Sequence, residues 1–100
     1  MGNAVPEVKQ ATLEIVKKDR KSNKAIAGAV YGVYSDKDGK NLITKMPATD
    51  ANGASSVTIT KTQDTVYLKE ISVPNGYLLD TKAYDVKLVI GDLAYIRPFL

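Results

Sequence analysis

The sequence contains no cysteine and no histidine. Without cysteine the chain has no internal disulfide and no thiol chemistry. Without histidine it lacks the most common general base and the most common metal ligand, and we expect neither a metal site nor a cofactor. No apolar run approaches the length of a transmembrane helix, so we predict no direct contact with a membrane.

The chain also lacks a strong excess of charge of either sign. Its formal net charge is +3, and most lysines alternate with acidic residues. This pattern argues against a nucleic-acid surface. One basic cluster stands out, although Asp19 interrupts it, and it has two interpretations: a solvated loop, which is the more usual case, or a site for an anionic surface. Its members are Lys17, Lys18, Arg20, Lys21 and Lys24.

A chain of 100 residues is long enough for a single domain with one modest core. Residues 1–10 include Gly2, Asn3 and Pro6 and show no periodicity, which predicts a linker from a preceding region. We therefore expect one domain over residues 11–100. Its valines, isoleucines, threonines and tyrosines favour strands over helices.

Apolar and polar residues alternate in short segments that are separated by clusters of turn residues. Gly91-Asp92 additionally predicts a two-residue hairpin between the last two segments. Turns at this spacing predict an all-β fold, an antiparallel Ig-like sandwich of about seven strands. The expected strands are residues 11–18, 29–35, 41–45, 55–60, 66–71, 83–90 and 93–100.

The most informative stretch runs from Val66 to Tyr77 and combines a strand with a turn. Pro74-Asn75-Gly76 supplies the turn, because proline presets φ and Asn-Gly tolerates positive φ. Glu70 lies on the same strand face as Val66 and Leu68, which is the face expected to point into the core. A carboxyl group in that position must be paired, protonated or at the end of the strand.

A second charged residue has the same problem in the first expected strand. Lys17 shares a face with Leu13 and Ile15, so its side chain is also expected to point inward. We therefore predict that Lys17 and Glu70 lie in contact. The alternative for Lys17 is that its aliphatic stem is covered while its ammonium group reaches water.

Four motifs follow one another in an order that resembles a known family. They are L-E-I-V-K-K-D at 13–19, I-A-G-A-V-Y-G-V-Y at 26–34, T-D-A-N-G at 49–53, and V-Y-L-K-E-I-S-V-P-N-G-Y at 66–77. Together they resemble the CnaB-type (prealbumin-like) domain of Gram-positive surface adhesins and pilins. The resemblance covers about residues 11–90, and its most specific part is E-x-x-x-P-x-G-Y.

The resemblance implies a structural stalk or spacer domain of a cell-surface adhesin or pilus. Such a domain lies outside the cell, at the cell wall, and its partners are neighbouring domains of the same protein. The alternative is an adhesin module whose loops bind a host extracellular protein or glycan. A turnover enzyme is disfavoured because no catalytic constellation is recognisable.

The resemblance also implies a self-made cross-link. In this family a lysine of the first strand forms an isopeptide bond with an asparagine or aspartate of the last strand, assisted by a glutamate. By position, Lys17 is the donor and Glu70 the assisting residue. Burial favours the neutral forms of amines and carboxylic acids in general. A neutral amine attacks a carbonyl group, and a protonated carboxyl group polarises that carbonyl.

The acceptor position departs from the family pattern. Ile96 precedes Arg97-Pro98 where the family's asparagine is expected, and its side chain offers no carbonyl group. The remaining candidates are weak: Asp80 falls in a loop, Asp85 on the outward face of its strand, and Asp92 in the expected hairpin turn. Either the chain forms no intrachain bond, or the acceptor lies beyond residue 100 or on another chain.

Overall fold

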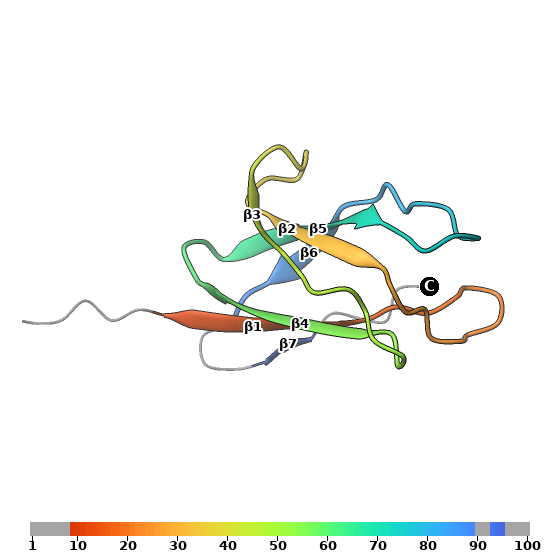
Figure 1. Cartoon of the computed structure of the whole chain (residues 1–100). Coiled ribbons are helices and arrows are strands. Elements are labelled where there is room, and N and C mark those ends of the chain that lie inside the picture. The colour runs from red at the N-terminus through yellow and green to blue at the C-terminus, as the bar shows by residue number, and fades with distance from the viewer. Residues whose placement is uncertain (1–8, 90–92, 96–100) are drawn as a thin grey trace, which may run out of the picture.

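The computed structural model describes residues 9–89 and 93–95, which form a sandwich of two β-sheets (Figure 1). The predicted all-β sandwich is therefore confirmed. The described residues include no helix long and apolar enough to cross a membrane. The strands are β1 (Gln10–Val16), β2 (Val30–Tyr34), β3 (Leu42–Lys45), β4 (Ala54–Thr60), β5 (Thr65–Ser72), β6 (Tyr84–Lys87) and β7 (Leu93–Tyr95).

One sheet has the strand order β4-β1-β7 and the other β3-β2-β5-β6. The described strand pairs are antiparallel except for β1 and β7, which run parallel, with Thr12 opposite Leu93 and Glu14 opposite Tyr95. The predicted hairpin between the last two strands is wrong. β6 pairs with β5, whereas β7 crosses to the other sheet and covers the free edge of β1.

Several strand ends differ from the prediction. The strand expected over 83–90 is confined to Tyr84–Lys87, although Leu88 remains buried and its N–H donates to the carbonyl of Asp64. The strand expected over 93–100 is described only for Leu93–Tyr95. The linker predicted over 1–10 lies largely outside the described residues, and β1 begins within it at Gln10.

The core lies between the two sheets and is built by the alternation seen in the sequence. Leu13 and Ile15 of β1 and Val66 and Leu68 of β5 are buried in one apolar cluster, as predicted from their spacing. Tyr31 and Val33 of β2 join them. Burying one such side chain stabilises the fold by about 1.5–3 kcal/mol, so the facing strands β1, β2 and β5 form the centre of the molecule.

A tight turn at residues 50–53 holds the end of β1. The Asp50 carboxylate accepts hydrogen bonds from the N–H groups of Asn52 and Ala54. Gly53 has a φ of 75°, and its carbonyl accepts a 2.7 Å hydrogen bond from the N–H of Lys17. A Cβ atom at Gly53 would lie 2.3 Å from the carbonyl oxygen of Lys17. The backbone at Lys17 therefore depends on a glycine in this turn.

We expect Gly53→Ala to destabilise the domain more than Gly76→Ala. Both glycines have positive φ, which costs an alanine about 1–2 kcal/mol, but a Cβ atom at Gly76 meets nothing within 4 Å. The backbone clash at Gly53 adds to this strain. The free energy of unfolding lost in Gly53→Ala should therefore exceed that lost in Gly76→Ala by about 1 kcal/mol or more. Urea unfolding of both variants measures the difference, and equal losses would contradict this account of the turn.

Candidate functional site: a buried lysine–glutamate pair between the sheets

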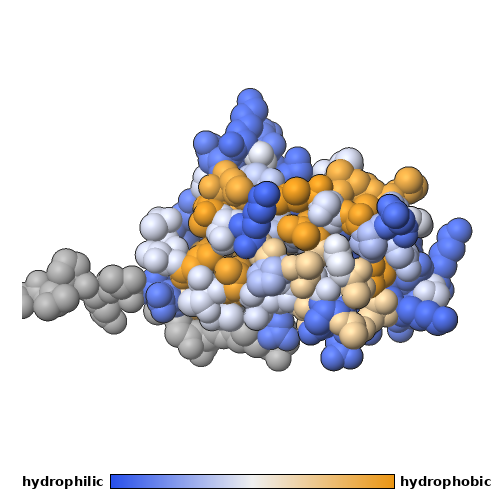
Figure 2. All heavy atoms as spheres, in the orientation of Figure 1, coloured by the Kyte–Doolittle hydropathy of each residue, from blue (hydrophilic) through white to orange (hydrophobic). Residues whose placement is uncertain are grey.

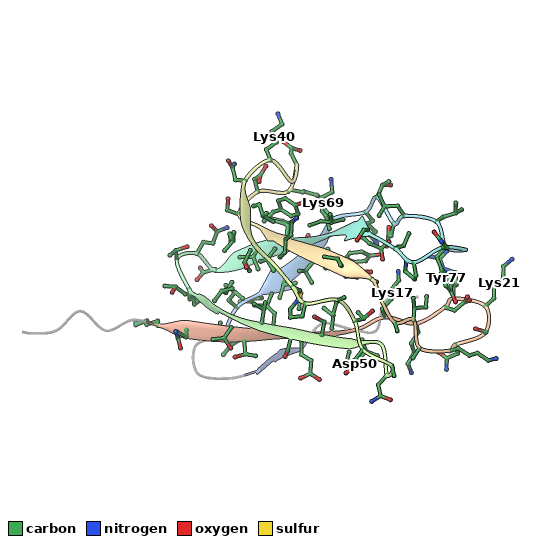
Figure 3. The ribbon with its side chains drawn as sticks, in the orientation of Figure 1. Lys17, Lys21, Lys40, Asp50, Lys69 and Tyr77 are labelled. Carbon is green, nitrogen blue, oxygen red and sulfur yellow. The ribbon has the colours of Figure 1, made fainter. Side chains whose placement is uncertain are left out.

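Lys17 directly follows β1 and continues its alternation by one residue. The backbone is held on both sides, because the Lys17 N–H donates to Gly53 and its carbonyl accepts from Ile26. The side chain consequently points inward, and only 9% of it is exposed. Figure 3 places Lys17 at the end of the sandwich that carries Tyr77 and Lys21.

Glu70 comes from the other sheet. It lies on β5 opposite Tyr31 of β2, and its side chain is fully buried. Its Oε2 lies 3.5 Å from the Nζ of Lys17, and its Oε1 accepts a 2.8 Å hydrogen bond from the N–H of Asp80. The predicted contact between Lys17 and Glu70 is therefore confirmed, and it joins the two sheets.

Tyr31 is the third polar group of this site. The Nζ of Lys17 lies 5.8 Å from the centre of its ring, within the range of a cation–π contact. Burial, followed by the charges of Glu70 and Asp80 and a hydrogen bond to Glu70, raises the pKa of the Tyr31 hydroxyl far above its ordinary value. Tyr31 therefore keeps its proton beside the Glu70 carboxyl group.

Asp80, a weak acceptor candidate in the sequence, belongs to the same network. Its carboxylate accepts hydrogen bonds from the Tyr84 hydroxyl and from the N–H of Lys82. Burial raises the pKa of Asp80, but these hydrogen bonds and the charges of Lys17 and Lys82 outweigh burial and hold that pKa below its ordinary value. Asp80 is thus ionised at neutral pH. Burial and the hydrogen bond to Asp80 raise the pKa of Tyr84 to about 12.

Of the other acceptor candidates, only Asp85 lies within the described residues, and it is not brought to the pair. Asp85 is exposed on β6, as expected for the outward face of that strand. Asp92 lies outside the described residues, as does Ile96 at the expected acceptor position. Within the described part of the chain, no group of three histidine, cysteine, aspartate or glutamate residues is arranged to hold a metal ion.

The sequence reasoning missed the roles of Tyr31, Tyr84 and the backbone of Asp80. Neither tyrosine hydroxyl gives a separate signal in the sequence. The loop between β5 and β6 has no periodicity that would place Asp80 over Glu70. Only the four-residue spacing of Asp80 and Tyr84 hints at a contact, and that spacing has no fixed meaning in a loop.

The arrangement brings an amine, a carboxyl group and a phenol together away from bulk water. Pairing offsets the large cost of burying either charge alone. Transfer of one proton from Lys17 Nζ to Glu70 Oε2 converts the ion pair into a neutral amine and a neutral acid. These are the forms in which an amine attacks a carbonyl carbon and an acid polarises the carbonyl oxygen. The site is equipped for amide formation if an acceptor reaches it.

Comparisons with known proteins point to one family of domains. The family model described as the SpaA prealbumin-like fold domain matches residues 11–94. A comparison with curated protein sequences found no match.

Among solved structures, the T6 backbone pilin of serotype M6 Streptococcus pyogenes is 31% identical, with a TM-score of 0.67, over 78% of this chain and 16% of that protein. The major pilin subunit BcpA of Bacillus cereus is 27% identical, with a TM-score of 0.70, over 88% of this chain and 27% of BcpA. The minor pilin GBS52 of Streptococcus agalactiae shares the fold, at 19% identity and a TM-score of 0.68, over 89% of this chain and 43% of GBS52. The chain spans less than half the length of each.

We expect removal of one partner of the buried pair to cost far more than removal of both. In a chain without a covalent link at Lys17, Glu70→Ala should lower the free energy of unfolding by about 3–5 kcal/mol, because Lys17 is left buried and unpaired. The double variant Lys17→Met with Glu70→Gln should lose less, because no charge is stranded and the glutamine oxygen still accepts from Asp80. Chemical unfolding of the single and double variants measures the coupling.

The matched control is the pair of Lys61 and Asp64, in which the Asp64 side chain is 86% exposed and the Lys61 side chain 17% exposed. Asp64→Ala, which removes the exposed partner, should cost far less than Glu70→Ala. If the two variants lose equal stability, the buried pair does not join the sheets in the way described.

Proposed function

Because this chain belongs to the SpaA prealbumin-like domain family, we propose that it is a structural stalk domain of a bacterial surface pilus or adhesin. In this role it lies outside the cell, between neighbouring domains of the same protein, and transmits force along the chain. The solved relatives support the proposal because they include backbone and major pilins. It requires no turnover chemistry.

The observation that carries this proposal is the parallel pairing of β1 and β7. Because the first and last described strands are parallel neighbours, the chain enters at one end of the sandwich, and β7 runs toward the opposite end (Figure 1). Tension applied through the chain therefore pulls β1 and β7 past each other. In this geometry the hydrogen bonds of the ladder share the load, whereas peeling breaks them one after another.

The buried pair adds resistance across the sandwich. β1 and β5 belong to different sheets, and Lys17 and Glu70 connect the end of one to the other. If β1 is pulled out of the sandwich, the pair separates and leaves two uncompensated charges in an apolar space, which is costly. The pair thus supports a mechanical role whether or not it takes part in a covalent bond.

We further propose that Lys17 and Glu70 occupy the positions of the donor and the assisting residue in the self-made isopeptide bond of this family. The Lys17 nitrogen would bond to the side-chain carbonyl carbon of an acceptor. An asparagine would release ammonia and an aspartate would release water. Close confinement supplies the effective concentration that amide formation in water lacks.

The acceptor is the missing part, and we propose that this chain forms no intrachain bond. Asp80 is near enough for its charge and that of Lys17 to interact, but an ionised carboxylate resists attack because it already carries negative charge. Asp85 points to solvent. Ile96 has no side-chain carbonyl group at the family's acceptor position. The role of the pair in this chain is therefore stabilisation, with its chemistry unused.

The stalk proposal predicts that resistance to force depends on direction. Pulling a tandem polyprotein of this domain through its chain ends shears β1 against β7, and we expect a high unfolding force in single-molecule experiments. Pulling through Gln10→Cys and Thr60→Cys, which lie opposite each other in the β1–β4 ladder, unzips that ladder and should need much less force. The chain has no cysteine of its own, so attachment is specific. Equal forces in both directions would contradict the stalk role.

The cross-link proposal predicts an unmodified intact mass for the parent chain by mass spectrometry. Ile96→Asn should then lose the mass of one ammonia and gain roughly 2–4 kcal/mol of stability, by analogy with a disulfide that constrains the unfolded chain.

Lys17→Met in the Ile96→Asn background is the control and should retain its full mass. A parent that already lacks one water, and regains it when Asp80, Asp85 or Asp92 is changed to alanine, would show that this aspartate is the acceptor.

A further inference from the structure

The end of the sandwich near Lys17 carries a cleft that the stalk function does not use. It lies between residues 17–21, which follow β1, and residues 76–80, which follow β5, and it has a volume of about 500 Å³. This is the size of a small ligand pocket. Figure 1 shows the two loops projecting side by side from the same end, and Figure 3 labels Lys21 on one and Tyr77 on the other.

One wall of the cleft is basic. It is lined by Lys18, Arg20 and Lys21. The acidic residue between them, Asp19, is hydrogen-bonded within its own loop. The Asp19 carboxylate accepts hydrogen bonds from the N–H groups of Lys21 and Ser22. The Asp19 N–H also donates to the carbonyl of Lys24. These hydrogen bonds hold the shape of the loop and engage the Asp19 carboxylate, so the basic side chains of the loop are available to a partner.

The opposite wall is apolar and unusually exposed. Leu78 is 94% exposed, and its neighbours Tyr77 and Leu79 are 42% and 46% exposed. An apolar patch bordered by polar residues marks an interaction site more often than chance exposure. Figure 2 shows hydrophobic and hydrophilic residues meeting at this end of the molecule.

Both walls are held in place, so the cleft exists before a partner arrives. The apolar wall is anchored at Asp80, whose N–H donates to buried Glu70 and whose carboxylate accepts from Tyr84 and Lys82. The Asp80 charge is therefore satisfied within the domain. A preformed site avoids the entropy cost of ordering loops on binding.

We propose that this cleft binds an extended acidic peptide segment that carries one bulky apolar side chain. The acids of the peptide would pair with Arg20 and Lys21, and its apolar side chain would pack against Leu78 and Leu79. Charge complementarity selects an acidic partner. The concave space between the walls selects a peptide over a lipid surface, because a flat bilayer does not enter a cleft with basic and apolar groups on opposite sides.

The test uses fluorescence anisotropy with a labelled synthetic peptide of glutamates around a central phenylalanine. We expect saturable binding that weakens as salt is raised. A peptide with lysines in place of the glutamates, and another with serine in place of the phenylalanine, should each bind at least about tenfold more weakly, because each lacks one of the two complementary features.

Two double variants test the contributions of the basic wall and the apolar wall to binding separately. Arg20→Glu with Lys21→Glu should weaken binding by about tenfold or more, and Leu78→Ser with Leu79→Ser should weaken it by about fivefold. The matched control is Lys37→Glu with Lys45→Glu, which makes the same charge change at exposed positions outside the cleft and should alter the affinity less than about twofold. Circular dichroism and thermal unfolding check that each variant is folded.

Three results would overturn the proposal. The first is no binding of the acidic peptide by the folded parent domain. The second is an equal loss of binding in the Lys37 and Lys45 control, which would mean that net charge alone attracts the peptide. The third is binding to vesicles of phosphatidylglycerol without binding to the peptide, which would assign the surface to an anionic membrane.

Discussion

The structure depends on the meeting of two opposite charges inside a sandwich that is otherwise apolar at its centre. Lys17 and Glu70 are each almost fully buried, and neither is tolerable there without the other. Their contact requires β1 to end where it does, which in turn requires the glycine turn at residue 53. It also fixes how the two sheets are placed, since the partners come from different sheets.

From this pair a chain of polar contacts leads to the surface. Glu70 accepts a hydrogen bond from the N–H of Asp80, and the Asp80 carboxylate accepts one from the hydroxyl of Tyr84. Tyr31 lies on the other side of Glu70 and stays protonated. The loop between β5 and β6 is therefore anchored on a buried carboxyl group, although it has no strand or helix of its own. The shape of the exposed loop cleft thus depends on the chemistry of the core.

The mechanical and chemical roles that we propose meet at the same place. The parallel pairing of β1 and β7 would direct tension along the ladder, and Lys17 directly follows β1. A covalent bond from Lys17 to the last strand would carry that tension through bonds that do not break thermally. Without an acceptor, the pair still opposes separation of the sheets, because separation would leave two buried charges unpaired.

The sequence by itself determined the class of fold, most of the strands, and the inward direction of Lys17 and Glu70. These features are local, because alternation along a strand sets which face a side chain takes. Only the tertiary structure decided that β7 joins β1 and not β6, that Asp80 is anchored and ionised, and that residues 17–21 face residues 76–80. These depend on contacts between distant segments, where burial, hydrogen bonds and charge act together. A sequence signal such as Gly91-Asp92 predicts a change of direction but not which sheet receives the next strand.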